Sequence, residues 1–138
     1  MKLKTTLAAL FSILVSFSSH GEWTEVYSED NTDYYIDFDT IKQHNGMVYF
    51  WRLDDYFVPK QGSLSSEIYS KGSCSYNKAG ILSVIDYKKS MGEGDGDSWN
   101  PEFAWHYLTP KDRLLSAVCK NIDDSFDRVM KTIGSKAY

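Results

Sequence analysis

The chain has 138 residues, with 15 Lys and Arg against 19 Asp and Glu, and a formal net charge of −4 at pH 7. An acidic surface repels phosphate backbones and no basic run occurs, so the composition argues against a nucleic-acid partner. The length suits one ordinary domain with its own hydrophobic core.

The N-terminal segment has the pattern of a secretory signal peptide. Lys2 and Lys4 precede the apolar run 7–15, and small residues allow cleavage after Ser18 or after Gly21. The run is far short of the roughly 20 apolar residues that span a bilayer, so we expect no transmembrane segment. No Cys lies near the cleavage positions, so we expect no lipid anchor. Cleavage after Gly21 leaves 138 − 21 = 117 residues with 13 basic and 19 acidic side chains, a net charge of −6.

The next segments alternate as β-strands do. Residues 23–27 (WTEVY) and 34–38 (YYIDF) each place alternate side chains on opposite faces. Asn45-Gly46 predicts a hairpin, because both residues tolerate the positive φ of a type I′ turn. Residues 47–57 (MVYFWRLDDYF) then form a long strand whose start is apolar on both faces, which indicates a central strand.

The middle of the chain continues the sheet. We expect a bulge at Gly72 within a polar strand and a long mobile hairpin loop over 88–102, which is rich in Gly and Asp. Further turns are expected at 59–62 and 77–80, and further strands at 64–76, 81–87 and 103–107.

After residue 108 the pattern becomes helical. Thr109 to Asp112 (TPKD) is a helix start, with Thr as N-cap, Pro at the first helical position and an acid three residues after the cap. Asp123 and Asp124 are the positions at which an interruption of the helix could occur, and Gly134 would end it. Its apolar stripe, with a spacing typical of one helix face, is Leu115, Val118, Cys119, Ile122, Phe126, Val129, Met130 and Ile133.

Cys74 and Cys119 are the two cysteines of the chain. In an exported protein an even count suggests a disulfide, with two free buried thiols as the alternative. A bridge would close a loop of 119 − 74 = 45 residues. The chain-entropy model assigns such a loop a stabilisation of about 4 kcal/mol. Because Cys119 lies on the apolar stripe, the bridge would fasten the helix to the sheet.

Several motifs occur in a characteristic order: Trp23, YYIDFDTI (34–41), VYFWRL (48–53), Cys74, the Gly-rich loop, FAWHYLTP (103–110) and SAVC (116–119). Together they resemble the surface-adhesin protein E-like family, small exported proteins of Gram-negative bacteria, over roughly residues 23–120. The resemblance implies an antiparallel sheet with a C-terminal helix and a Cys74–Cys119 disulfide. It also implies binding rather than catalysis, since the family prototype is an adhesin for host matrix proteins. The missing lipoprotein cysteine and the tail 123–138 depart from the family pattern.

Asp37 and Asp39 raise the question of an acid/base or metal site. Both alternate with Ile36 and Phe38, so we expect them to point away from the apolar face, about 7 Å apart. No nucleophile or metal-ligating His accompanies them in the sequence. We therefore interpret them as strand-end residues whose oxygens accept backbone N–H bonds in a turn.

Other polar residues give no specific site either. Asp95 and Asp97 match the first two ligand positions of an EF-hand loop, but the later positions do not fit, which leaves only a weak cation site open. His44 adjoins a turn and His106 lies in a strand, without a recognisable catalytic or ligand set. We expect no catalytic residue, metal or cofactor.

The aromatic content is the positive signal. Tyr and Trp number 10 + 4 = 14, too many for the core of one small domain. These residues concentrate at recognition surfaces, although cross-strand pairing is the alternative for most of them. The candidate partner-binding residues are Tyr49, Trp51, Trp99 and Trp105, of which Trp99 stands out because its loop is polar.

We therefore expect an α+β fold: a single twisted antiparallel sheet of about six strands, a C-terminal α-helix packed on it and one disulfide. The expected divisions are a signal peptide (1–21), an adhesin-E-like domain (22–122) and a helical extension or tail (123–138). The expected function is non-enzymatic binding of a protein partner, a host matrix or envelope component. The expected location is the periplasm, with the cell surface or secretion as alternatives.

Three further readings stay open. The first is a periplasmic envelope-assembly or inhibitor factor. The second is a small hydrolase that uses the Asp37 and Asp39 carboxylates. The third concerns assembly, since an open edge strand would allow a dimer.

Overall fold

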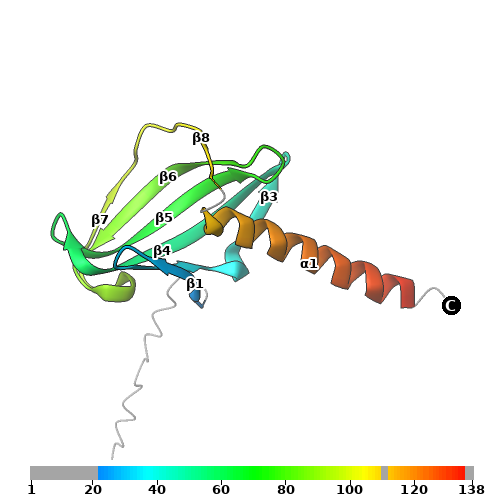
Figure 1. Cartoon of the computed structure of the whole chain (residues 1–138), viewed down its shortest axis with the longest axis horizontal. Helices are drawn as coiled ribbons and strands as arrows, with labels where there is room; N and C mark the ends of the chain where they lie inside the picture. The colour runs from blue at the N-terminus through cyan, green and yellow to red at the C-terminus, as the bar shows by residue number, and fades with distance from the viewer. Residues whose placement is uncertain (1–21, 110–111, 136–138) are drawn as a thin grey trace, which may run out of the picture.

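The computed structural model describes residues 22–109 and 112–135, an antiparallel sheet that carries one long helix (Figure 1). The strands are ordered β1-β2-β4-β5-β6-β7, with β3 also beside β4 and β8 also beside β6. Their bounds are β1 Thr24–Glu29, β2 Thr32–Ile36, β3 Lys42–His44, β4 Met47–Lys60, β5 Ser63–Ser73, β6 Lys78–Tyr87, β7 Gly96–Trp99 and β8 His106–Tyr107. Two 3-10 turns, η1 (Phe38–Thr40) and η2 (Ser90–Gly92), and the helix α1 (Arg113–Ser135) complete the described chain. The predicted α+β class is confirmed, whereas the predicted signal peptide lies outside the described residues.

Tight turns join the first strands. The predicted hairpin at Asn45-Gly46 is confirmed, with φ of 50° and 73° at the two residues, as a type I′ turn requires. Two further pairs of residues with positive φ connect β1 to β2 and β4 to β5: Asp30-Asn31 and Gln61-Gly62. Such turns match the twist of the strands they join, which sets the register of this half of the sheet.

Several predicted boundaries after residue 70 are wrong. The segment 88–102 is not one long loop, because it contains η2 and the edge strand β7, which pairs with β6. All four β7 residues are exposed, so the strand has no alternation of buried and exposed positions to reveal it. The predicted strand 103–107 shrinks to the two residues of β8. β5 ends at Ser73 and β6 starts at Lys78, so the turn between them lies earlier than predicted.

The first half of α1 covers one face of the sheet. Its residues Leu114, Leu115 and Val118 form the buried cluster with Ile36, Val48 and Phe50 of β2 and β4. Because successive strand residues point to opposite faces, all the sheet members of this cluster lie on the same side. This side is called the helix face below.

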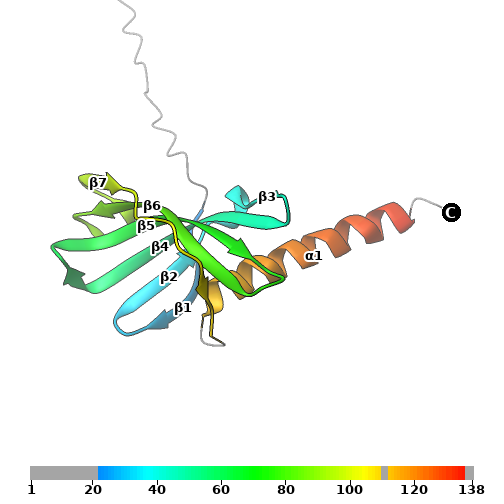
Figure 2. The same cartoon turned by 90° about the horizontal axis from the view of Figure 1, so that it is seen from above.

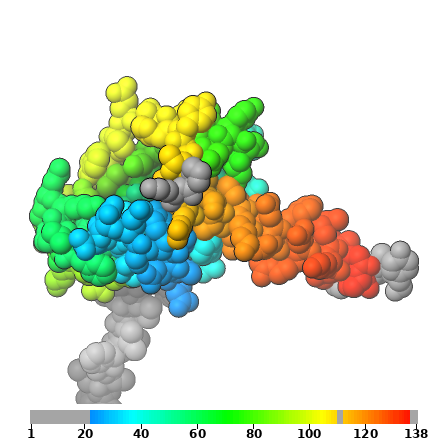
Figure 3. Space-filling model, viewed as in Figure 1, coloured from blue at the N-terminus to red at the C-terminus, as the bar shows by residue number. Residues whose placement is uncertain are grey.

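The second half of α1 leaves the sheet. At 23 residues the helix is about 35 Å long, and its end projects beyond the sheet in two perpendicular views (Figures 1 and 2). Figure 3 shows this half standing clear of the other elements. The apolar residues Phe126, Val129, Met130 and Ile133 are 50–64% exposed, so the second half of the apolar stripe does not pack on the sheet. The helix passes through Asp123 and Asp124 without interruption.

Gly72 lies where α1 crosses β5. It pairs in register with Val48, so the bulge predicted at Gly72 is wrong, and the irregularity between β5 and β6 falls between Tyr69 and Ser70. A Cβ atom on Gly72 would lie 2.4 Å from Leu115 Cδ1 and 3.3 Å from Val48 Cγ2. The missing side chain therefore lets the helix approach the sheet closely.

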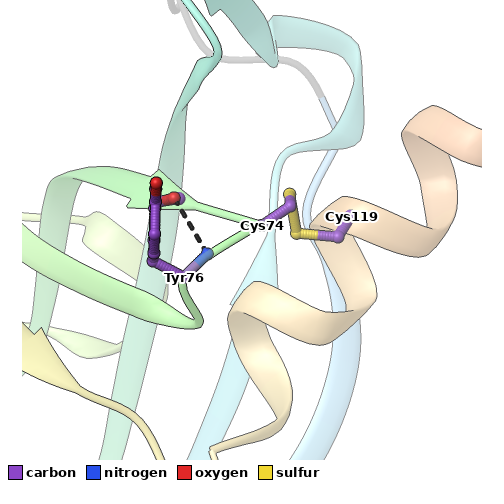
Figure 4. The surroundings of a disulfide bond; sticks show 4 residues. Cys74, Tyr76 and Cys119 are labelled. Atoms are coloured by element: carbon purple, nitrogen blue, oxygen red, sulfur yellow. Dashed lines mark hydrogen bonds between the residues drawn. A yellow bond between two sulfur atoms is a disulfide. The ribbon is translucent and has the colours of Figure 1, made fainter.

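A disulfide fixes the same crossing. Cys74, which directly follows β5, is bonded to Cys119 of α1 with the Cα atoms 5.9 Å apart, as predicted (Figure 4). The adjoining turn is closed by the backbone N–H of Tyr76, which donates to Ser73 Oγ at 3.2 Å. Within residues 22–109 and 112–135, no helix is long and apolar enough to cross a membrane.

Removal of the disulfide tests its share of the stability. The double variant Cys74→Ser, Cys119→Ser should lower the free energy of unfolding by about 2–4 kcal/mol, because the unfolded chain regains the freedom of a 45-residue loop. Urea titration of the oxidised protein and of the variant measures this difference. A reducing agent should destabilise the natural protein and leave the variant unchanged, and equal midpoints for both oxidised proteins would contradict the expectation.

A methyl group at Gly72 tests the helix crossing. Gly72→Ala should destabilise the protein by about 1–3 kcal/mol, because Leu115 is buried and must leave its rotamer or push the helix away. The matched control is Gly134→Ala in the projecting part of α1, where no atom lies within 4 Å of the new Cβ. Thermal unfolding of both variants separates the clash with Leu115 from the general effect of replacing Gly by Ala. Similar melting temperatures for the two variants would refute the clash.

Candidate functional site

The face of the sheet opposite α1 carries a group of aromatic and basic side chains. Tyr49 and Trp51 flank Phe50, which packs under the helix, so they point to the other side of β4. On β5, Lys71 pairs with Tyr49 and Tyr69 pairs with Trp51, which brings their side chains to the same side. Together with Phe103, Trp105 and Lys78 they are called the aromatic face below.

Ring and ammonium contacts make the aromatic face continuous. The ring centroids of Trp51 and Tyr69 are 4.9 Å apart, and those of Tyr49 and Tyr69 are 6.3 Å apart. Lys71 Nζ then lies 5.8 Å from the ring centre of Tyr49 and 5.5 Å from that of Trp105, so its ammonium bridges two groups of rings. Such cation–π contacts contribute about 0.5–1 kcal/mol each at exposed sites.

The segment before β8 supplies the second group of rings. Phe103 and Trp105 meet edge to face, with centroids 5.0 Å apart, and Lys78 Nζ lies 4.6 Å from the ring centre of Trp105. Gly80 on β6 makes room for them, since a Cβ there would lie 2.4 Å from Phe103 Cε2 and 2.6 Å from the Ala104 carbonyl oxygen. The segment therefore lies directly on the sheet.

The electrostatics of the aromatic face differ from those of the chain as a whole. Lys71 and Lys78 place two positive charges among the rings of a protein whose net charge is −4. Burial raises the pKa of the Tyr69 phenol, and the neighbouring Tyr49 raises it further. Tyr69 therefore stays neutral at pH 7 and keeps an O–H donor. The face offers flat apolar area, phenol donors and cations, a combination suited to binding a protein surface.

The structure separates the four residues predicted to bind a partner. Tyr49, Trp51 and Trp105 belong to the aromatic face, whereas Trp99 pairs with Val84 of β6 and points to the helix face. Trp99 is 50% exposed and lies in an ordered edge strand, not in a mobile loop. Sequence reasoning missed Tyr69, Lys71, Lys78 and Phe103, although the strand alternation places Tyr69 and Lys71 on one side of β5.

Asp37 and Asp39 have different surroundings. Asp37 is fully buried, and its Oδ1 accepts a hydrogen bond from the backbone N–H of Asp39 at 3.1 Å, which caps η1. The expected turn hydrogen bond is therefore present, but the expectation that both carboxylates point outward is wrong for Asp37, because its carboxylate is buried where it caps η1. Asp39 is exposed. Within the described part of the chain, no three His, Cys, Asp or Glu side chains are grouped as a metal site would need.

Comparison with known proteins identifies the chain. The sequence profile described as surface-adhesin protein E matches residues 23–120. The chain belongs to the surface-adhesin protein E family. The match includes both cysteines, the whole aromatic face and Trp99, whereas residues 121–135 of α1 lie beyond it.

A solved structure of protein E from Haemophilus influenzae, in crystal form II, is similar in fold. Crystal form II is 21% identical, with 74% of this chain and 87% of that chain covered and a TM-score of 0.54. A structure of protein E from the non-typeable bacterium is 18% identical, with 72% and 82% covered and a TM-score of 0.47. No curated protein sequence matches this member of the family significantly.

Gly80 provides a test of how the aromatic face is built. Gly80→Ala should displace Phe103 and the Ala104 backbone, since the new Cβ would overlap both. We expect the indole N–H signal of Trp105 to move in an NMR spectrum while that of Trp99 stays in place. Gly134→Ala, in the projecting part of α1 with no atom within 4 Å of the new Cβ, controls for a general effect of the added methyl group. Unchanged signals for Trp105 would show that the segment does not depend on Gly80.

Proposed function

We propose that this protein is an exported, non-enzymatic, adhesin-like binding protein that recognises a protein partner through the aromatic face. The carrying observation is the continuous set of rings and ammonium groups on the side of the sheet that α1 does not cover. Membership of the surface-adhesin family supports a role in adhesion.

The composition of the face supports a protein as the ligand. The centres of protein interfaces are enriched in Tyr, Trp and Phe, and a few such residues contribute most of the binding energy. Tyr69 has a central position, because its ring touches those of both Tyr49 and Trp51. Lys71 and Lys78 favour a partner that presents acidic side chains around an apolar patch.

The expected leader supports export. We propose the periplasm as the first location, and the cell surface or the medium as alternatives. The description of the matching family, surface-adhesin protein E, supports the cell surface as one of these alternatives. Protease treatment of intact cells distinguishes these locations, because only surface-displayed protein is degraded before the outer membrane is opened.

Paired alanine variants test the aromatic face. Mature protein is applied to purified host matrix proteins and to isolated envelope proteins, and its affinity is measured for each partner that it binds. Tyr69→Ala, Trp105→Ala should weaken binding by at least about 2 kcal/mol, roughly 30-fold, because both groups of rings lose their central member. Phe126→Ala removes an exposed ring from the projecting half of α1, outside the aromatic face, and should bind as the natural protein does.

Unfolding curves of each variant must show a folded protein under the binding conditions. A partner that the double variant binds with unchanged affinity would rule out the aromatic face as its site. If instead Asp37→Asn, Asp39→Asn alone abolished activity on a substrate while stability was retained, the carboxylate hydrolase would replace the binding function.

A further inference from the structure

A groove lies on the helix face of the sheet, at the end away from α1. Its volume is about 570 Å³, and it is lined by residues from β4 to β7 and the turns between them. In Figure 1 this region is the end of the sheet marked by β7, whereas α1 crosses the opposite end. The lining residues used below are Tyr56, Lys60, Gln61, Lys88, Asp97 and Trp99, and the feature is called the indole groove.

A chain of hydrogen bonds fixes one wall of the indole groove. The Tyr56 hydroxyl donates to Ser66 Oγ at 3.0 Å, and Ser66 Oγ donates to Asp86 Oδ1 at 2.5 Å. The second carboxylate oxygen, Asp86 Oδ2, accepts from Trp99 Nε1 at 2.7 Å. The Asp86 carboxylate therefore lies in the middle of the network and links Ser66 to Trp99.

This network determines what Trp99 offers to a ligand. Its only polar group, the indole N–H, is already bonded to Asp86, so the half-exposed ring presents its flat apolar face. A ring held in one orientation loses little conformational freedom when a ligand stacks on it, which favours binding.

The remaining lining is polar and balanced in charge. Lys60 and Lys88 contribute two positive charges, and Asp86 and Asp97 contribute two negative charges. Lys60 Nζ lies 4.5 Å from the ring centre of Tyr56, and Gln61 adds an amide with both donors and acceptors. An anionic ligand would be repelled by the Asp97 carboxylate. An apolar ligand would leave the polar groups of the lining without hydrogen-bond partners, which costs free energy.

We propose that the indole groove binds a neutral sugar unit, with the C–H face of a pyranose ring stacked on Trp99. The flat side of an indole ring is electron-rich and attracts polarised C–H groups. Hydroxyl groups both donate and accept hydrogen bonds, so they match the mixed lining of Lys60, Gln61, Lys88 and Asp97. Asp86 is a positioning residue in this site, since both its oxygens are used within the protein.

This site is independent of the protein-binding proposal. Trp99 and the aromatic face lie on opposite faces of the sheet, so one protein molecule can hold a sugar and a protein partner at once. An adhesin with both sites would bind the sugar and the protein of a glycosylated surface at the same time. Its overall affinity for that surface would then exceed the affinity of either site alone.

NMR titration of the mature protein tests the site. The probes are the methyl glycosides of glucose, galactose, mannose and N-acetylglucosamine. We expect at least one of them to shift the indole N–H signal of Trp99 in a saturable way at millimolar concentration, while the signals of Trp23, Trp51 and Trp105 stay in place. The Trp99 signal is assigned by its absence from Trp99→Ala.

Three variants locate the binding. Trp99→Ala should weaken it about tenfold by removing the stacking surface, whereas Trp99→Phe should retain part of it. Asp86→Ala keeps the indole but frees it, so the affinity should fall while Trp99 remains present. Trp105→Ala on the aromatic face should bind the glycoside as the natural protein does, and amide spectra confirm that each variant is folded.

Three results would overturn the proposal. They are the absence of a saturable shift with any glycoside, an unchanged affinity in Trp99→Ala, and binding only of a sulfated disaccharide that added salt abolishes. The last result would make Lys60 and Lys88 an anion site. The protein-binding function is judged separately, because Tyr69→Ala, Trp105→Ala should lose the protein partner and keep the sugar.

Discussion

The close contact between α1 and the Gly72 end of the sheet is the constraint on which the rest of the structure depends. Leu115 occupies the space that a side chain at position 72 would fill, and the Cys74–Cys119 bond fastens the helix to the same place. The buried apolar residues of β2 and β4 at this crossing, Ile36, Val48 and Phe50, pack against the helix. Because α1 is the one α-helix among residues 22–109 and 112–135, the other face of the sheet must be covered in another way.

On the aromatic face, rings cover the sheet in place of a second layer of helices. Cross-strand pairs such as Trp51 with Tyr69 cover the backbone of the central strands, and the segment 101–105 lies over β6 because Gly80 has no side chain. At the other end, η2 folds onto the same face, where Met91 N–H donates to Asp55 Oδ1 and Gly92 N–H donates to Ser65 Oγ. The half-buried rings between these two covers are therefore both structural and available to a partner.

The helix face has a corresponding uncovered end. Since α1 packs over Val48 and Phe50, it does not reach Tyr56, Ser66 and Asp86 further along the sheet. Polar side chains there satisfy one another in a network that ends on Trp99. Thus the position of one helix creates both surfaces for which a function is proposed, one on each side of the sheet.

Local chemistry was enough to predict much of this protein from its sequence. Alternation along 47–57 identified the central strand, Asn45-Gly46 identified a hairpin, and the apolar spacing after residue 113 identified the helix. These features depend on neighbours within a few residues, which is why a single sequence reveals them. The ordered motifs also indicated the family, and with it the Cys74–Cys119 pair.

Only the tertiary structure decided which residues act together. The exposed strand β7 has no burial pattern, so its pairing with β6 and the anchoring of Trp99 by Asp86 could not be read from the sequence. The functions of Gly72 and Gly80 depend on side chains more than 20 residues away along the chain. Trp105 joins Tyr49 through Lys71, while Trp99 is directed to the opposite face, because register and the side covered by α1 determine where each ring points.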